Sequence, residues 1–182
     1  LVEKELLSAL RTRWTASQRV VRFAAGREYT FKHALIQEAV YGSLLRKTRR
    51  SMHADCARVI ETRFADHLHD AYGMLAYHYL RADVLERAEE YTFKAGELAA
   101  RTAASHEALR YFREAYRIYQ IISGKKGDKA KRALLEKNIA QALFNTGNLR
   151  ESIEHYDASL SLCGEWLPKS TMTLWLKFGL DI

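Results

Sequence analysis

The chain has 182 residues, with one proline and nine glycines. Lys and Arg number 29 against 22 Asp and Glu, a formal net charge of +7, and 48% of the residues are hydrophobic. Because proline breaks helix interiors, its scarcity favours a mostly helical protein, and the hydrophobic fraction is too high for a disordered chain. A catalytic domain built on a large α/β sheet is therefore not expected.

The first third of the chain, residues 1–66, changes its hydrophobic period twice. Residues 1–10 have the pattern of a short amphipathic helix, and residues 14–32 alternate around Gly26 as the two strands of a hairpin do. From His33 the period is helical again, and the stripe of a further helix consists of Met52, Cys56, Val59, Ile60 and Phe64. Helix, β-hairpin wing and helices together predict the C-terminal part of a winged-helix domain.

Residues 67–182 predict an antiparallel array of helices. Asp83 and Glu86 have the spacing of a capping box that begins one helix, Gly147 ends another, and Pro168 suits the first turn of a last helix. The apolar residues of that last helix are Leu174, Trp175, Leu176 and Phe178. Helices of about 12–20 residues joined by short loops pack as antiparallel neighbours.

An internal repeat runs through this array. Its first copy comprises Ala76, Ala88, Thr92 and Ala95, and its second comprises Ala140, Ser152, Tyr156 and Ser159. Small residues let two helices approach closely, and this spacing is typical of the tetratricopeptide (TPR) repeat of about 34 residues. The predicted fold is thus mostly α, with a partial winged helix in residues 1–66 and TPR-like repeats in residues 67–182 that continue past them. A generic helical hairpin remains an alternative for the first copy.

Two stretches resemble a known family. The segment from Tyr29 to Tyr41, with Arg49, Arg50 and His53 after it, resembles the winged-helix segment of bacterial signal-transduction ATPases with numerous domains (STAND ATPases). Residues 75–99 look like the helical repeats that follow in those proteins, many of which carry a class III adenylate or guanylate cyclase domain. The resemblance covers about residues 20–120, and it implies that this chain is a segment of a longer ATPase.

The resemblance gives His33 a specific role. In related ATPases a histidine that opens a winged-helix helix contacts the phosphate of bound ADP, within a Met-His-Asp motif. Here Lys32-His33-Ala34 keeps only the histidine of that motif. A helix N-terminus also favours a phosphate, so His33 is the predicted nucleotide-phosphate sensor. The alternative is a histidine that packs or caps at the junction between hairpin and helix.

Excess positive charge is confined to the first third of the chain. Residues 1–66 hold 13 Lys and Arg against 7 Asp and Glu, whereas residues 67–182 hold 16 against 15. The excess peaks at Arg46, Lys47, Arg49 and Arg50. We expect these four residues to contact another domain or a phosphate, or to lie in a solvated turn. Binding of nucleic acid ranks below both, because the cluster follows the predicted wing and not the candidate recognition helix.

No catalytic group is predicted from the sequence. There is no phosphate-binding Gly-x-x-x-x-Gly-Lys-Ser/Thr loop, and the histidines and two cysteines lack metal-ligand spacing, so neither a metal site nor a resident cofactor is expected. ATP or ADP would belong to the longer protein. No apolar run is long enough to span a membrane. The two cysteines, Cys56 and Cys163, lie far apart in the sequence, which fits a reducing compartment and favours the cytoplasm.

The expected function is regulatory and non-catalytic. The helical repeats would bind a protein or peptide, and that event would be relayed to a nucleotide-binding domain upstream in the same polypeptide. Two alternatives belong to other classes: a DNA-binding winged-helix regulator, and a purely structural repeat scaffold.

Overall fold

The computed structural model describes residues 7–8, 21–22, 28–31, 33–124 and 127–165. Packing divides the chain into two compact units, Leu1–Arg49 and Arg50–Ile182. This is a different division from the predicted domain boundary at 66/67, which stays a prediction. The predicted last helix from Pro168 lies outside the described residues.

The first unit contains three short strands, β1 (Leu7–Ser8), β2 (Val21–Arg22) and β3 (Glu28–Phe31). They pair antiparallel in the order β1-β3-β2, with Leu7 opposite Phe31 and Val21 opposite Tyr29. The predicted winged helix is wrong, because a strand at Leu7–Ser8 replaces the helix expected over residues 1–10. Outside these strands, the regular elements of the described chain are helical.

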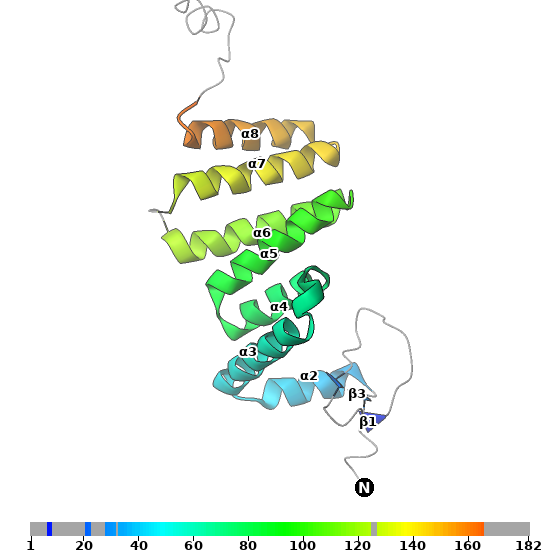
Figure 1. The fold of residues 1–182 in the computed structure, drawn as a ribbon. Coiled ribbons are helices and arrows are strands. Elements are labelled where there is room, and N and C mark those ends of the chain that lie inside the picture. The colour runs from blue at the N-terminus through cyan, green and yellow to red at the C-terminus, as the bar shows by residue number, and fades with distance from the viewer. Residues whose placement is uncertain (1–6, 9–20, 23–27, 32, 125–126, 166–182) are drawn as a thin grey trace, which may run out of the picture. The chain divides into compact units, whose positions relative to one another are not determined.

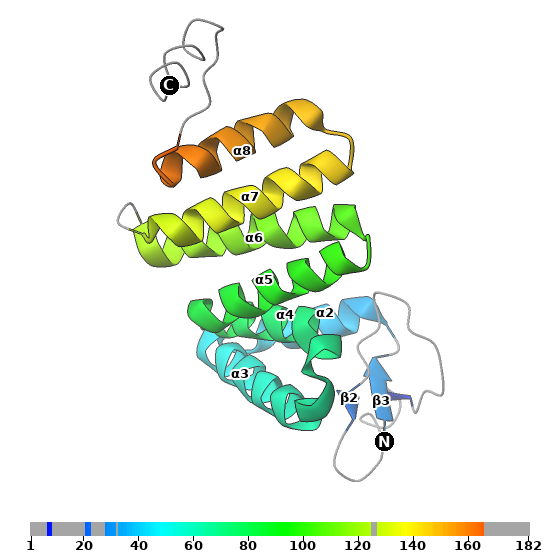
Figure 2. The ribbon, with the colours of Figure 1, turned by 45° about the horizontal axis from the view of Figure 1, so that its top comes forward.

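The helices follow the strands without interruption by further sheet in the described residues. Their bounds are α2 Ala34–Ser43, α3 Arg46–Arg63, the 3-10 helix η1 Ala65–Ala71, α4 Tyr72–Ala82, α5 Leu85–Arg101, α6 Ser105–Ser123, α7 Lys129–Asn145 and α8 Leu149–Leu162. In the second unit, α4 to α8 run alternately up and down and each packs on the next (Figures 1 and 2). The predicted antiparallel helical array is compatible with this arrangement.

Small residues fill the places where neighbouring helices cross, as the repeat predicts. Ala88 and Ala140 have no exposed surface, and Ser152 is 2% exposed. The Ser152 hydroxyl donates to the Ala140 carbonyl oxygen at 2.8 Å, and the Ser159 hydroxyl donates to that of Ala133 at 2.8 Å. The second repeat copy therefore binds α8 to α7 through hydrogen bonds as well as close packing.

A further copy of the repeat, which the sequence analysis missed, joins α5 to α6. Gly96 lies so close to α6 that a Cβ atom on it would stand 2.7 Å from the Phe112 ring. The copy consists of Gly96, Ala108, Phe112 and Ala115, each 44 residues before Ala140, Ser152, Tyr156 and Ser159. Helix α5 thus belongs to two hairpins. Its Ala88 side packs on α4, and its Gly96 side packs on α6.

Two local predictions differ from the structure. Asp83 is the C-cap of α4, with a left-handed φ of 66°, and Val84 takes the N-cap position of α5, so the predicted capping box does not form. On α3 the buried residues are His53 and Ala57, whereas Met52 and Val59 are 51% and 59% exposed. Cys56 is exposed as well, but Ile60 and Phe64 of the predicted stripe pack against the core, so the helix was predicted correctly and its buried side in part.

We expect Gly96→Ala to destabilise the array. Its methyl group would displace the Phe112 ring from a packed core, a change that costs about 1–3 kcal/mol and exceeds the gain in helix propensity. Urea unfolding followed by circular dichroism measures the loss.

The matched control is Gly73→Ala in α4. A Cβ atom there would meet only the Tyr111 hydroxyl, at 2.8 Å, which is the far end of a side chain that can move. A loss of stability equal in the two variants would contradict the close crossing at Gly96.

Candidate partner-binding surface

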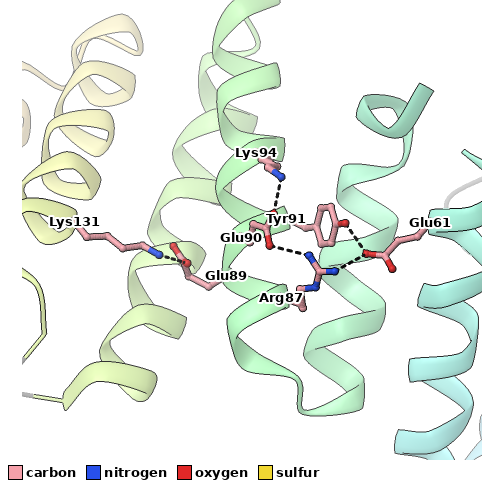
Figure 3. A network of polar contacts seen from close by, with 7 residues as sticks. All are labelled: Glu61, Arg87, Glu89, Glu90, Tyr91, Lys94 and Lys131. Carbon is pink, nitrogen blue, oxygen red and sulfur yellow. Dashed lines mark hydrogen bonds and ion pairs between the residues drawn. The ribbon is translucent and has the colours of Figure 1, made fainter. Parts of the chain in front are cut away.

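An ion pair joins the alternate helices α5 and α7. Lys131 Nζ of α7 is 2.5 Å from Glu89 Oε2 of α5, and Figure 3 shows the two side chains pointing toward each other from their helices. The Glu89 side chain is 4% exposed and Lys131 is 42% exposed. Lys131 Nζ also lies 5.3 Å from the ring centre of Tyr119 on α6. The cation of α7 therefore contacts side chains of both preceding helices, α5 and α6.

A second polar network links α3 to α5 (Figure 3). The Tyr91 hydroxyl donates to Glu61 Oε1 at 2.6 Å, and Arg87 lies 3.7 Å from the same carboxylate. Glu90 accepts from Arg87 at 3.2 Å and from Lys94 at 2.6 Å. These two bonds hold the pKa of Glu90 below its usual value, that with Lys94 contributing most. Acidic and basic side chains thus alternate along this network, from Glu61 through Arg87 and Glu90 to Lys94.

Two stacked tyrosines form the inner part of this network. The rings of Tyr79 and Tyr91 are 5.7 Å apart and nearly parallel, at 5°. Burial, and then the Glu61 carboxylate, raises the pKa of Tyr79 to about 12. The same two causes raise the pKa of Tyr91. Both phenols therefore remain protonated donors over the whole physiological pH range.

Because the α5–α6 and α7–α8 hairpins are equivalent, α5 and α7 carry equivalent stripes of exposed or half-buried residues. On α5 this stripe consists of Glu86, Glu90, Glu97 and Arg101, and on α7 the equivalent stripe consists of Ala130, Leu134, Gln141 and Asn145. Leu134 is 44% exposed, and the adjacent Phe144 is 55% exposed. We call these two stripes with Phe144 the α5–α7 face.

The polar residues of the α7 stripe are held in place. Tyr156 of α8 donates its hydroxyl to Gln141 Oε1 at 2.9 Å, and Gln141 Nε2 donates to Asn145 Oδ1 at 3.1 Å. Gln141 is thus oriented from both sides while it stays exposed beside Phe144. A fixed amide next to an exposed aromatic ring provides a polar and an apolar contact to one ligand at low entropic cost.

His33 is exposed and directly precedes α2 as its N-cap residue. Its backbone carbonyl accepts from the amides of Ile36 and Gln37, but its imidazole makes no capping hydrogen bond. The imidazole therefore does not cap α2. Contact of His33 with a nucleotide phosphate stays a prediction.

The four basic residues lie in the first turns of α3 and not in a turn between helices. Arg50 pairs with Asp83 at 2.5 Å, and the Arg49 guanidinium lies 5.1 Å from the centre of the Tyr41 ring. Arg46 and Lys47 are exposed. Two of the four cations thus have partners within the chain, and their contact with another domain or a phosphate stays a prediction.

One histidine contact was not foreseen from the sequence. His53, which is 5% exposed, places its Nδ1 3.0 Å from Nδ1 of His78. One ring must donate and the other accept, so this pair links α3 to α4 through a single shared proton. Only the approach of two helices brings these histidines together, and 25 residues separate them in the sequence.

In the part of the chain that the structure describes, no group of three or more His, Cys, Asp or Glu side chains could hold a metal ion. Among the same residues, no helix is both long enough and apolar enough to cross a membrane.

No protein-family model matches the chain, and comparisons with curated proteins and with solved structures found no match. The resemblance of residues 20–120 to signalling ATPases therefore stays a prediction.

We expect stability to fall between pH 10 and pH 12 because of Tyr79. Its pKa is about 12 in the folded chain against 10.0 unfolded, so the folded state holds the proton more tightly in this range. The stabilisation is complete below pH 10 and is lost as pH rises through 12. Urea unfolding at pH 9 and pH 11 should show a smaller loss for Tyr79→Phe than for the unmodified protein.

Phe93→Leu on α5, which removes a ring without an ionisable group, is the control for this measurement, and it should lose as much stability as the unmodified protein. Equal losses in all three proteins would contradict the assignment to Tyr79.

We expect Lys131→Met to lower the free energy of unfolding by about 1–3 kcal/mol, because it leaves a buried carboxylate without its partner. In a Glu89→Gln background the same substitution should cost less, and this double-mutant cycle isolates the pair.

Arg150→Met removes an exposed cation that lies 3.6 Å from Glu154 on α8. It serves as the control and should leave stability unchanged. Additive effects of the Lys131 and Glu89 substitutions would show that the two side chains do not interact.

Proposed function

We propose that the helical array is a protein-interaction module that binds a segment of a partner protein along the α5–α7 face. The supporting observation is the exposed Phe144, at 55%, and Leu134, at 44%, beside the oriented Gln141. Apolar and aromatic groups that a core leaves exposed are typical anchors of an interface. The TPR-like spacing supports the same role, because stacked helical hairpins present extended surfaces to partners.

The chemistry of the face defines the partner. Its α7 half offers Leu134, Phe144 and the Gln141 amide, whereas its α5 half carries Glu86 and Glu97 against Arg101, with Glu90 already paired to Arg87 and Lys94. A complementary segment has an apolar side chain for the α7 half and one or more basic side chains for the α5 half. Charge complementarity of this kind sets orientation and speeds association.

In a longer protein, we propose that such binding regulates a nucleotide-binding domain of the same polypeptide. The resemblance of residues 75–99 to the repeats of STAND ATPases supports this proposal. Regulation requires that the partner bind one nucleotide state of the protein more tightly than the other. In this proposal, the role of the segment itself is binding and not catalysis.

Selection from a displayed peptide library against the purified chain tests the binding function. We expect enriched peptides that combine an apolar residue with basic residues. By isothermal titration calorimetry, Phe144→Ala should weaken their binding about tenfold, because loss of one anchor costs more than about 1 kcal/mol.

Ile121→Ala, on α6, is the matched control because Ile121 is 56% exposed and lies outside the α5–α7 face. It should leave affinity unchanged. The proposal fails if no peptide is enriched, or if Phe144→Ala binds the enriched peptides as tightly as the unmodified chain does.

A further inference from the structure

The side of the α7–α8 hairpin that carries Ile153, here called the α7–α8 groove, is equivalent to the side of the α5–α6 hairpin on which α7 packs, here called the α5–α6 groove. In the α5–α6 hairpin, Leu109 and Phe112 are 8% and 2% exposed, because Ile139 and Leu143 of α7 pack in the same cluster. Their equivalents 44 residues later are Ile153 and Tyr156. Ile153 is 60% exposed among the described residues. It is thus a large apolar side chain at the position that is buried in the equivalent hairpin, but no described helix packs over it.

We propose that residues 168–182 of the same chain form a helix that occupies the α7–α8 groove as α7 occupies the α5–α6 groove. The connection lengths agree. Residues 124–128 join α6 to α7, and residues 163–167, also five in number, separate α8 from Pro168. Proline is favoured at the first position of a helix, so the sequence places a helix start where the repeat requires one.

The apolar residues after Pro168 also have the same spacing as the buried residues of α7. The buried residues Leu135, Ile139 and Leu143 of α7 follow its first residue, Lys129, at fixed distances. At the same distances after Pro168 the sequence has Leu174, Phe178 and Ile182. Each pair is 39 residues apart. Apolar residues at this spacing form one side of a helix.

The end of α8 turns the chain back in the required direction. Gly164 has a left-handed φ of 83°, and the amide of Glu165 donates to the Leu160 carbonyl oxygen at 2.9 Å. This bond closes a Schellman motif, which stops a helix and reverses the chain.

Docking of this segment leaves the α5–α7 face open. Phe144 and Gln141 are the equivalents of Ala100 and Glu97, and Ala100 remains exposed although α7 fills the groove beside it. The inference therefore goes beyond the proposed function and does not depend on it: one groove is filled from within the chain, and the α5–α7 face is left for a partner.

Disulfide trapping in the full chain tests the docking. In a Cys56→Ser, Cys163→Ser background, Ile153→Cys combined with Phe178→Cys should form an intramolecular disulfide on mild oxidation, detected by mass spectrometry of the proteolysed monomer. Glu151→Cys with Phe178→Cys is the control, because Glu151 is 56% exposed and, two residues from Ile153, lies on the opposite side of α8, where it pairs with Arg113 of α6. Trapping no more efficient than this control overturns the proposal, as does a disulfide that joins two copies of the chain.

The change in Tm caused by a charged residue at position 153 tests the docking independently of disulfide formation. Ile153→Asp should lower Tm by several degrees more than Ile121→Asp, although the two isoleucines are 60% and 56% exposed among the described residues. Equal changes in Tm would mean that nothing covers Ile153, and would overturn the proposal.

Discussion

The arrangement of the array depends on how closely its helices approach at their crossings. Ala88, Ala108, Ala115 and Ala140 are completely buried, and Gly96 leaves no space for even a methyl group next to Phe112. Larger residues there would separate α5 from α6, and with them α5 from α7. Lys131 reaches Glu89 only because these helices are close. The ion pair and the α5–α7 face are therefore consequences of small side chains several residues away.

Buried polar groups add specificity to this packing. Small apolar surfaces slide over one another at little cost, whereas a serine hydroxyl must meet its carbonyl acceptor. Ser152 and Ser159 fix α8 on α7 in this way, and Glu136, 7% exposed, meets His155 of α8 with 2.5 Å between Oε2 and Nδ1. Loss of one partner of a buried pair costs more than the pair contributes, so each one disfavours alternative registers of its helices.

The helical array was predictable because its signals are local. Gly147 and the spacing of Ala140 and Ser152 determine a turn and a crossing within 20 residues of chain. The strand at Leu7–Ser8, which overturns the predicted winged helix, was not predictable, because the choice between strand and helix there is decided by pairing with β3, more than 20 residues away. The α5–α6 copy was missed because α5 serves two hairpins, and the first hairpin had already accounted for Ala88 and Ala95. The α5–α7 face required the structure, since exposure of Phe144 follows from what packs beside it.

A rigid array can transmit a binding event but cannot by itself switch. From the α5–α7 face, Lys131 and Glu89 connect α7 to α5, and Tyr91 and Glu61 connect α5 to α3, so these contacts link the three helices into one body. Coupling to a nucleotide site requires an element with two discrete arrangements that partner and nucleotide both bias. The proposed regulation therefore demands that a partner also contact a part of the protein that moves relative to this body. A partner held by the α5–α7 face alone would bind every state equally, and equal affinity shifts no equilibrium.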